Sequence, residues 1–321
     1  EKVKGTYSVL AAVNNVGLVA FRDGQGRRPL YYGVQYNKKQ EIVRYAFASE
    51  TVALEKMLYK GTSTTFRLPN GQQGYDEVPP GAMMFISKDF EVYQKQIIEP
   101  MPLLCPFEAV YFERASSFFY GQRVREIRKK LIHQLWERFA QSQNYTAIAQ
   151  EPLENKIIVA IPNTASSPAL YLSQQTGIPY DMSMEKTQGS GRIFMKPGQR
   201  HREHNTIIHH YLFEEDVKGK HVIMVDDSIV RGTTSKQDIK YLKDAGAKSI
   251  HVFILFPEIR HPCMHAIDFH TYEELFTYNK TEQQMKTSLG LRDSDSLYFS
   301  THEDLKKAIG TNNLCNECYQ P

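Results

Sequence analysis

The sequence predicts an α/β protein that contains a parallel sheet. Three short apolar runs have the composition of buried strands, and they lie at residues 156–162, 221–225 and 249–256. Two segments with helical character alternate with these runs, at residues 167–176 and 235–245. Because strands that alternate with helices are typical of parallel sheets covered by helices, we expect that architecture in this part of the chain.

The first hundred residues have a different pattern, which predicts strands and turns. Their short apolar runs are mostly rich in aromatic and β-branched residues, and turn sequences such as Pro79-Pro80-Gly81 interrupt them. These runs are residues 7–13, 16–21, 30–36 and 83–86. An amphipathic helix is then predicted from residue 122 to about residue 143, where apolar residues recur at helical spacing without Gly or Pro.

A chain of 321 residues is long enough for about two domains. The change in pattern falls in a Pro-rich stretch at residues 100–106. We therefore expect one domain at residues 1–100 and a second at residues 101–321.

The balance of charge limits the classes of function. The 39 Lys and Arg residues exceed the 36 Asp and Glu residues by only three, which is unfavourable for a protein that mainly coats nucleic acid or an anionic membrane. No apolar run approaches the roughly 18 residues that a membrane helix needs, and no signal peptide opens the sequence. We expect a cytoplasmic protein with no nucleic acid or membrane partner.

The most informative segment follows the apolar run at residues 221–225. Two carboxylates, Asp226 and Asp227, end this run, and a loop rich in hydroxyl groups then leads into a helix. Ligands bind at the carboxyl ends of parallel strands, and the backbone N–H groups of a helix start attract anions. The carboxylates would face ribose hydroxyls or a Mg²⁺-linked group, so the segment predicts a site for a phosphorylated sugar.

A less specific interpretation is an ordinary α/β turn with helix-capping residues and solvated acids. Other nucleotide-binding motifs are absent: the sequence has neither G-x-x-x-x-G-K-[ST] nor a G-x-G-x-x-G that follows a strand. A P-loop NTPase and a dinucleotide-binding dehydrogenase are therefore disfavoured.

The run VDDSIVRGTT at residues 225–234 resembles the phosphoribosyl diphosphate signature of type I phosphoribosyltransferases, and that of amidophosphoribosyltransferases in particular. Stretches similar to that family occur in the same order along nearly the whole chain, at residues 17–23, 28–30, 48–50, 80–81, 107–108, 111–112, 245–248 and 266–268. The resemblance implies a type I phosphoribosyltransferase parallel sheet preceded by part of an N-terminal nucleophile (Ntn) α+β sandwich. It also implies transfer of an amino group from ammonia to phosphoribosyl diphosphate, which gives 5-phosphoribosylamine and pyrophosphate for purine synthesis.

The resemblance also implies roles for individual residues. Lys186, Arg192, Asp226 and Asp227 would be catalytic, and Thr164 would join the two aspartates at Mg²⁺. The substrate-binding residues would be Ser228, Ile229, Val230, Arg231, Gly232, Thr233 and Thr234. Three positions depart from the family pattern: Asn163 replaces an acid, and Gln188 and Gly189 replace Arg and Tyr in a loop at residues 185–202. The resemblance implies that this loop closes over pyrophosphate. The alternative is a solvated basic loop.

The resemblance begins within the glutaminase part of the family. Members of the family open with a nucleophilic Cys, whereas this sequence opens with Glu1. Taken alone, the chain is therefore expected to lack glutaminase activity and to act as a homo-oligomer or with a separate glutaminase part. The alternative function is that of a non-catalytic regulatory homologue that binds phosphoribosyl diphosphate.

The chain has four cysteines, which are Cys105, Cys263, Cys315 and Cys318. The spacing of the last two suits Zn²⁺, iron–sulfur or redox chemistry, whereas isolated cysteines are usually buried small residues. Each of the four falls where the iron–sulfur subclass of amidophosphoribosyltransferases has a cluster ligand. The resemblance therefore implies a [4Fe–4S] cluster, with zinc as the rival.

Overall fold

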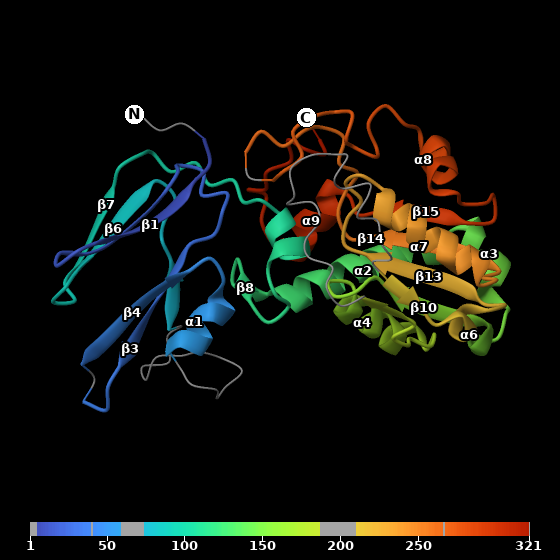
Figure 1. Cartoon of the computed structure of the whole chain (residues 1–321), viewed down its shortest axis with the longest axis horizontal. Coiled ribbons are helices and arrows are strands. Elements are labelled where there is room, and N and C mark those ends of the chain that lie inside the picture. The colour runs from blue at the N-terminus through green and yellow to red at the C-terminus, as the bar shows by residue number, and fades with distance from the viewer. Residues whose placement is uncertain (1–4, 40, 59–73, 187–209, 266, 321) are drawn as a thin grey trace. The chain divides into compact units, whose positions relative to one another are not determined.

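The computed structural model describes residues 5–39, 41–58, 74–186, 210–265 and 267–320, and it divides into two compact units (Figure 1). Unit 1 comprises residues 1–108, 112–124 and 311–315, and unit 2 comprises residues 109–111, 125–310 and 316–321. The expected domain boundary at residue 100 falls inside unit 1, so the division into domains at that residue stays a prediction. The segment 311–315 belongs to unit 1 because Leu314 forms a parallel bridge with Leu104.

Unit 1 contains two antiparallel sheets. The first has the order β1-β2-β6-β7, with β1 at Ser8–Val13, β2 at Gly17–Arg22, β6 at Ala82–Ser87 and β7 at Val92–Gln96. The second has the order β4-β3-β5, with β4 at Ile42–Ala48, β3 at Tyr31–Tyr36 and β5 at Tyr75–Glu77. A hairpin of β8 (Phe118–Phe119) and β9 (Gln122–Arg123) and helix α1 (Thr51–Leu58) complete its regular structure in the described residues.

Unit 2 is built on a parallel sheet of four strands in the order β10-β13-β14-β15. The strands are β10 (Lys156–Ala160), β13 (His221–Asp226), β14 (Ser249–Ile254) and β15 (Ser296–Phe299). Every residue of β10 and β14 is buried, as expected for strands covered on both faces. The predicted parallel α/β sheet is thereby confirmed.

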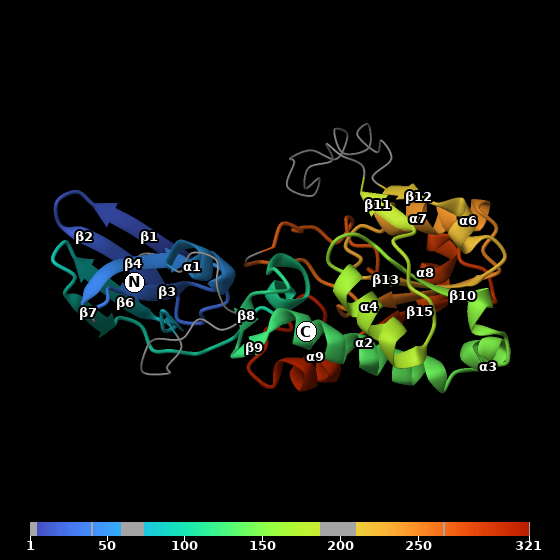
Figure 2. The same cartoon turned by 90° about the horizontal axis from the view of Figure 1, so that it is seen from below.

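The remaining elements of unit 2 are mostly helices (Figure 2). The helices are α2 (Val124–Ala140), α3 (Gln143–Ala149), α4 (Ser166–Thr176), α6 (Glu214–Val217), α7 (Thr233–Asp244), α8 (Glu282–Leu289) and α9 (His302–Ile309). A short helical turn lies at Leu153–Asn155, and another lies at Glu108–Phe112, whose two end residues belong to unit 1. Strand β11 (Met184–Lys186) pairs with β12 (His210–Leu212) in a separate hairpin.

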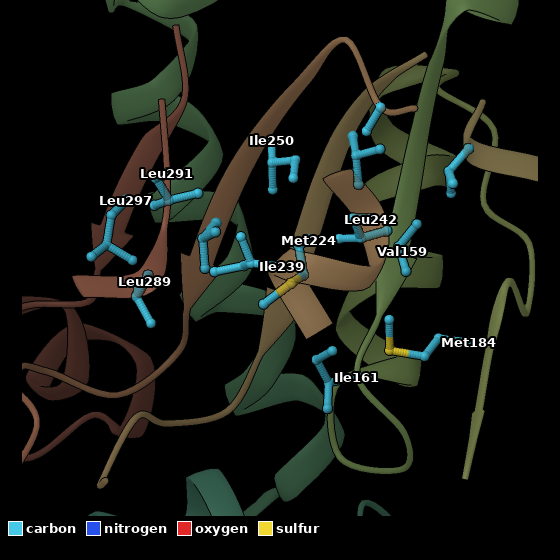
Figure 3. Packing of buried hydrophobic residues seen from close by; sticks show 14 of the residues in the cluster. Val159, Ile161, Met184, Met224, Ile239, Leu242, Ile250, Leu289, Leu291 and Leu297 are labelled. Carbon is cyan, nitrogen blue, oxygen red and sulfur yellow. The ribbon is translucent and has the colours of Figure 1, made fainter. Parts of the chain in front are cut away.

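Alternate side chains of the sheet face different helices. Met224 and Ile250 lie in the main core cluster with Ile239 and Leu242 of α7 and with Leu289 of α8 (Figure 3). On the other face, Phe139 of α2 packs against Phe253 and Tyr298, with ring centroids 5.3 and 5.8 Å away. The amphipathic pattern that predicted a helix at residues 122–143 is therefore the pattern of α2, which buries its apolar side against the sheet.

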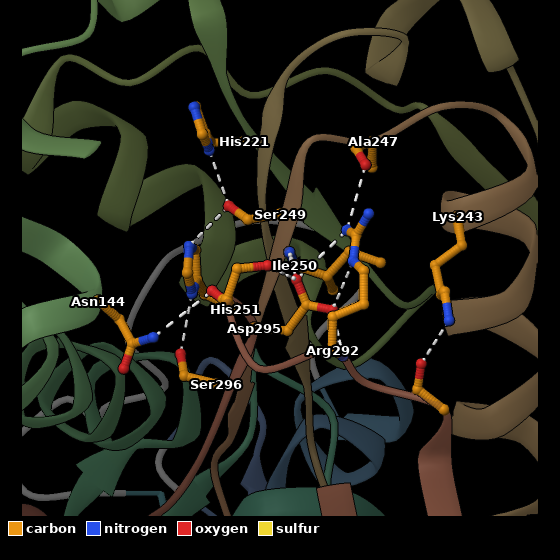
Figure 4. Close-up of polar contacts among 12 residues, drawn as sticks. Asn144, His221, Lys243, Ala247, Ser249, Ile250, His251, Arg292, Asp295 and Ser296 are labelled. Atoms are coloured by element: carbon orange, nitrogen blue, oxygen red, sulfur yellow. Dashed lines mark hydrogen bonds and ion pairs between the residues drawn. The ribbon is translucent and has the colours of Figure 1, made fainter. Parts of the chain in front are cut away.

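A polar network lies at the amino ends of the parallel strands (Figure 4). The Ser249 hydroxyl lies 2.8 Å from Nδ1 of His221 and 2.9 Å from Nε2 of His251, and Nδ1 of His251 lies 2.9 Å from the Ser296 hydroxyl. These groups are at the opposite end of the sheet from the acid pair that ends β13. Their hydrogen bonds satisfy polar groups that would otherwise be buried without partners.

One element of the first hundred residues was missed by the sequence pattern, which predicted strands and turns there. Residues 51–58 form helix α1, whose buried Leu54 and Leu58 pack with Tyr31 and Tyr75. Two turns of helix contain too few apolar residues to establish a period, so the helix depends on this packing. In the described residues, no helix combines the length and the apolar character that crossing a membrane requires.

Candidate active site

The candidate site lies at the carboxyl edge of the parallel sheet. Strand β13 ends at Asp226, and its neighbour β10 pairs with it in register, Ala160 opposite Val225. The chain that follows β10 carries Thr164, so the loop with the expected Mg²⁺ contact leaves the sheet beside the acid pair. On the other side, the N–H groups of Leu255 and Phe256 donate to the carbonyls of Asp226 and Asp227, at 3.0 and 2.9 Å. The acid pair is therefore held between two neighbouring strands.

Both carboxyl groups are buried, at 6% exposure for Asp226 and 8% for Asp227. Burial raises the pKa of Asp226 well above its usual value, and the negative charges of Asp227 and Asp238 raise it further. Burial also raises the pKa of Asp227, to about 6, although the Ser228 hydroxyl, which donates to Oδ2 over 2.8 Å, and the charge of Arg128 oppose the shift. Adjacent buried carboxylates of this kind favour the arrival of positive charge or of hydroxyl donors.

The loop after the acid pair is shaped by Gly232. Its φ of +75° lies in the left-handed region, and a Cβ built there would approach the Phe276 ring to 2.5 Å. The Phe276 N–H in turn donates to the Val230 carbonyl over 2.8 Å. Glycine is required here because both the dihedral angle and the close approach of the ring exclude a side chain.

Helix α7 begins directly after this glycine, which as the N-cap residue has no side chain to cap the helix. The first N–H groups of a helix have no partner within the helix, so those of α7 are suited to an anion such as phosphate. Thr233 and Thr234 are exposed at this end, and Ser228 is partly exposed. The loop therefore offers both amides and hydroxyls to solvent, as a phosphate site requires.

Arg231 does not point freely toward an anion. It forms an ion pair with Glu274 and donates to the Asp268 carbonyl over 3.2 Å. These contacts fasten the loop to the segment after β14. Ile229 is buried and Val230 is partly buried. These two expected substrate-binding residues therefore contribute backbone groups and packing.

Of the three remaining expected residues, Thr164 and Lys186 lie in the described part of the chain. Thr164 is partly buried in the loop before α4. Lys186 is exposed at the end of β11, opposite His210 of β12. Arg192 and the departures Gln188 and Gly189 lie outside the described residues, so the expectation of a loop that closes over pyrophosphate stays a prediction.

The sequence reasoning missed three residues that contribute to this site. Arg128 of α2 is 3% exposed, and its charge acts on Asp227. Asp238 of α7 is 1% exposed and acts on Asp226, and His210 lies 2.9 Å from it. In the sequence, Arg128 resembles the other cations of an amphipathic helix surface. Only the fold shows that its side chain is buried. Asp238 interrupts the apolar side of α7, which was the available sequence signal.

Of the four cysteines, Cys105 and Cys315 are buried, and Cys263 and Cys318 are partly exposed. In unit 1, backbone bonds join the neighbourhoods of Cys105 and Cys315: the Cys315 N–H donates to the Leu104 carbonyl over 2.8 Å, and Arg27 donates to the Cys315 sulfur over 2.6 Å. In unit 2, the N–H groups of residues 260 and 261 donate to the Cys318 carbonyl, close in sequence to Cys263. Within the described ranges, no three His, Cys, Asp or Glu residues form a metal-holding group.

Comparisons with known proteins identify related chains. A family model described as the phosphoribosyl transferase domain matches residues 126–277. The chain is 35% identical over 319 residues to the amidophosphoribosyltransferase of Pyrococcus horikoshii and 31% identical over 319 residues to that of Bacillus subtilis. These alignments cover 99% and 98% of this chain and 62% and 60% of the relatives.

Solved structures are similar over the same extent. One described as the allosteric regulatory enzyme of purine biosynthesis has a TM-score of 0.77 and 30% identity, and the match covers 98% of this chain and 62% of that one. The glutamine phosphoribosylpyrophosphate amidotransferase of B. subtilis, complexed with ADP and GMP, has a TM-score of 0.75 and 30% identity, with 99% and 62% covered. The chain thus spans about three fifths of the length of these relatives.

Proposed function

Because the chain contains a phosphoribosyl transferase domain and is related along nearly its whole length to the amidophosphoribosyltransferases, we propose that it transfers an amino group to phosphoribosyl diphosphate. The nitrogen of ammonia forms a bond to the anomeric carbon, the bond from that carbon to pyrophosphate breaks, and the nitrogen releases a proton. The products are 5-phosphoribosylamine and pyrophosphate. The observation that carries the proposal is the buried acid pair, followed after a short loop by a helix start whose N-cap is Gly232, at the carboxyl edge of the sheet.

The residues of the site suit separate parts of the substrate. The N–H groups at the start of α7, with the hydroxyls of Thr233 and Thr234, would bind the 5-phosphate. The carboxylates of Asp226 and Asp227 would accept hydrogen bonds from the ribose hydroxyls. Lys186 would neutralise charge on the departing pyrophosphate. The non-catalytic regulatory homologue would use the same contacts for binding alone.

Mg²⁺ fits this donor set, because two adjacent buried carboxylates favour a cation. Thr164, Asp226 and Asp227 would hold it, directly or through water, and it would supply charge neutralisation for the diphosphate. We propose Mg²⁺ as a cofactor on this basis.

We also propose that Cys105, Cys263, Cys315 and Cys318 bind a [4Fe–4S] cluster. Four thiolates are the donor set that such a cluster requires, and zinc accepts the same donors. The buried Arg27 that donates to Cys315 supports a thiolate at that sulfur. A reducing compartment such as the cytoplasm would keep these thiols available.

The proposal is tested by the release of pyrophosphate from phosphoribosyl diphosphate, with Mg²⁺ and ammonium chloride at mildly alkaline pH. D226N and D227N keep the size of the side chains but remove their charge, so we expect turnover to fall by at least about 100-fold. The matched control is D244N, since Asp244 lies exposed at the far end of α7 and pairs only with Lys240 among the ion pairs described.

Turnover that persists in both acid variants would show that the site is assigned wrongly. Tight binding of phosphoribosyl diphosphate without any pyrophosphate release, in the parent chain supplied with ammonia, would favour the regulatory homologue instead.

A further inference from the structure

A buried acid–histidine contact lies next to the candidate site, between β12 and α7. Nδ1 of His210 is 2.9 Å from Oδ1 of Asp238, and the two residues are 5% and 1% exposed. The second oxygen of Asp238, Oδ2, is buried and has no hydrogen-bond partner in the described part of the chain. Asp238 is therefore a buried acid with one hydrogen-bonding side chain beside it.

Such a contact is costly for the fold. A carboxylate that leaves water loses its hydration, and one partner with a free second oxygen restores only part of that loss. Two apolar side chains of similar volume at these positions would be at least as stable. A role in the site gives a physical reason for the pair.

The pair connects two elements that the site needs. His210 and Leu212 lie on the inward side of β12, whereas Tyr211 between them is 59% exposed. Leu212 and Met184 anchor the β11–β12 hairpin in the main core, and His210 anchors its other end to α7. The same helix begins directly after the loop at residues 228–232, so Asp238 and the end of that loop belong to one continuous element.

We propose that His210 and Asp238 are a positioning pair, which fastens the β11–β12 hairpin to α7 and keeps a negative charge beside the Asp226–Asp227 site. The charge of Asp238 favours the entry of net positive charge, and therefore of Mg²⁺ with the substrate. Only this electrostatic half rests on the function proposed above. The mechanical half, the attachment of the hairpin, is a property of the fold.

Three variants separate the two halves. D238N keeps an oxygen that accepts from His210 but removes the charge. H210L leaves the acid without its partner. The double variant H210L/D238L replaces the pair by apolar side chains.

Hydrogen exchange at β12, with β14 as an internal reference, reports the attachment of the hairpin. The Mg²⁺ concentration that gives half-maximal binding of phosphoribosyl diphosphate reports the charge.

We expect D238N to leave exchange at β12 unchanged and to raise the half-maximal Mg²⁺ concentration by about three- to tenfold. H210L should speed exchange at β12. The double variant should restore the protection of β12 against exchange, but its half-maximal Mg²⁺ concentration should stay raised. The matched control is D304N, because Asp304 is a buried acid paired with Arg138. It should change stability but not the Mg²⁺ dependence.

Unchanged exchange at β12 in H210L would overturn the mechanical half. A normal Mg²⁺ dependence in D238N or in the double variant would overturn the electrostatic half and leave the pair a packing feature. If the parent chain bound no phosphoribosyl diphosphate at any Mg²⁺ concentration, the proposed function would fail and the electrostatic half with it. The exchange measurement, which needs no ligand, would still decide the mechanical half.

Discussion

Gly232 illustrates how one residue determines the shape of the loop at residues 228–232, which we propose as the phosphate site. A side chain there would meet the Phe276 ring and would also have to adopt a φ of +75°. We expect G232A to lose about 1–2 kcal/mol of stability and to bind phosphoribosyl diphosphate much more weakly, because the loop must move away from the ring. Urea unfolding and calorimetric titration measure the two effects.

The control for this change is G246A. Gly246 also has a positive φ, +88°, but a Cβ there would lie 3.6 Å from Lys218, which leaves room for it. It follows the far end of α7, so G246A should lose stability without losing affinity. Equal affinities in the two variants would contradict the role given to Gly232.

A second prediction at this scale concerns pH. Burial lowers the pKa of His251 to about 4, whereas the pKa of an unfolded histidine is about 6.5. Between these values the unfolded chain binds a proton that the folded chain does not, so this histidine lowers stability as pH falls from about 6.5 to about 4. The contribution over that window is up to about 3 kcal/mol.

Urea unfolding at several pH values between about 7.5 and 4.5 measures this contribution. H251Q should be less stable than the parent at high pH, because it disturbs the contacts with Ser249 and Ser296, but the difference should shrink as the pH falls. H133Q is the control, since the His133 side chain is 48% exposed. A difference between H251Q and the parent that is independent of pH would contradict the prediction.

At the scale of elements, two helices offer a matched comparison. Thr281 and Thr301 cap α8 and α9 in the same way, each accepting from the N–H three residues later, at Gln284 and Asp304. Asp304 is also buried and paired with Arg138 of α2, whereas Gln284 is exposed. The cap of α9 is therefore part of a larger network.

We expect T301A to lose about 1 kcal/mol or more, and T281A to lose less. Loss of the Thr301 hydroxyl frees the start of α9 and with it the acid that holds Arg138. Urea unfolding of both variants tests the order, and turnover with ammonia should stay near that of the parent in both. A larger loss in T281A would show that the contact with α2 adds nothing to the cap.

At the scale of the whole molecule, the proposed cluster predicts the behaviour of purified protein. Protein prepared without oxygen should be brown, contain iron and inorganic sulfide, and lose both colour and stability in air. Absorption spectra, iron and sulfide analysis, and thermal unfolding measure the colour, the composition and the stability before and after exposure to air. C318S is expected to lose the colour because it removes one of four ligands.

A colourless anaerobic preparation with one zinc per chain would replace the cluster by a zinc site. Four thiols that react fully with an alkylating reagent in folded protein would exclude both metals.

The sequence by itself determined the features that depend on neighbouring residues. The apolar runs that became β10, β13 and β14 and the amphipathic pattern of α2 predicted a parallel sheet with helices, and the run at residues 225–234 predicted where the acid pair and phosphate loop lie. The prediction of the sheet and its helices succeeded because period and turn chemistry are properties of short segments. The assignment of residues 225–234 to a phosphate site stays a prediction.

Only the tertiary structure decided which distant residues act on that site. Arg128, His210 and Asp238 come from three elements, α2, β12 and α7, and each has an ordinary place in its own segment. Helix α1 likewise depends on packing against tyrosines more than fifteen residues away. Electrostatic effects and burial act through space, so chain separation conceals them until the fold brings the groups together.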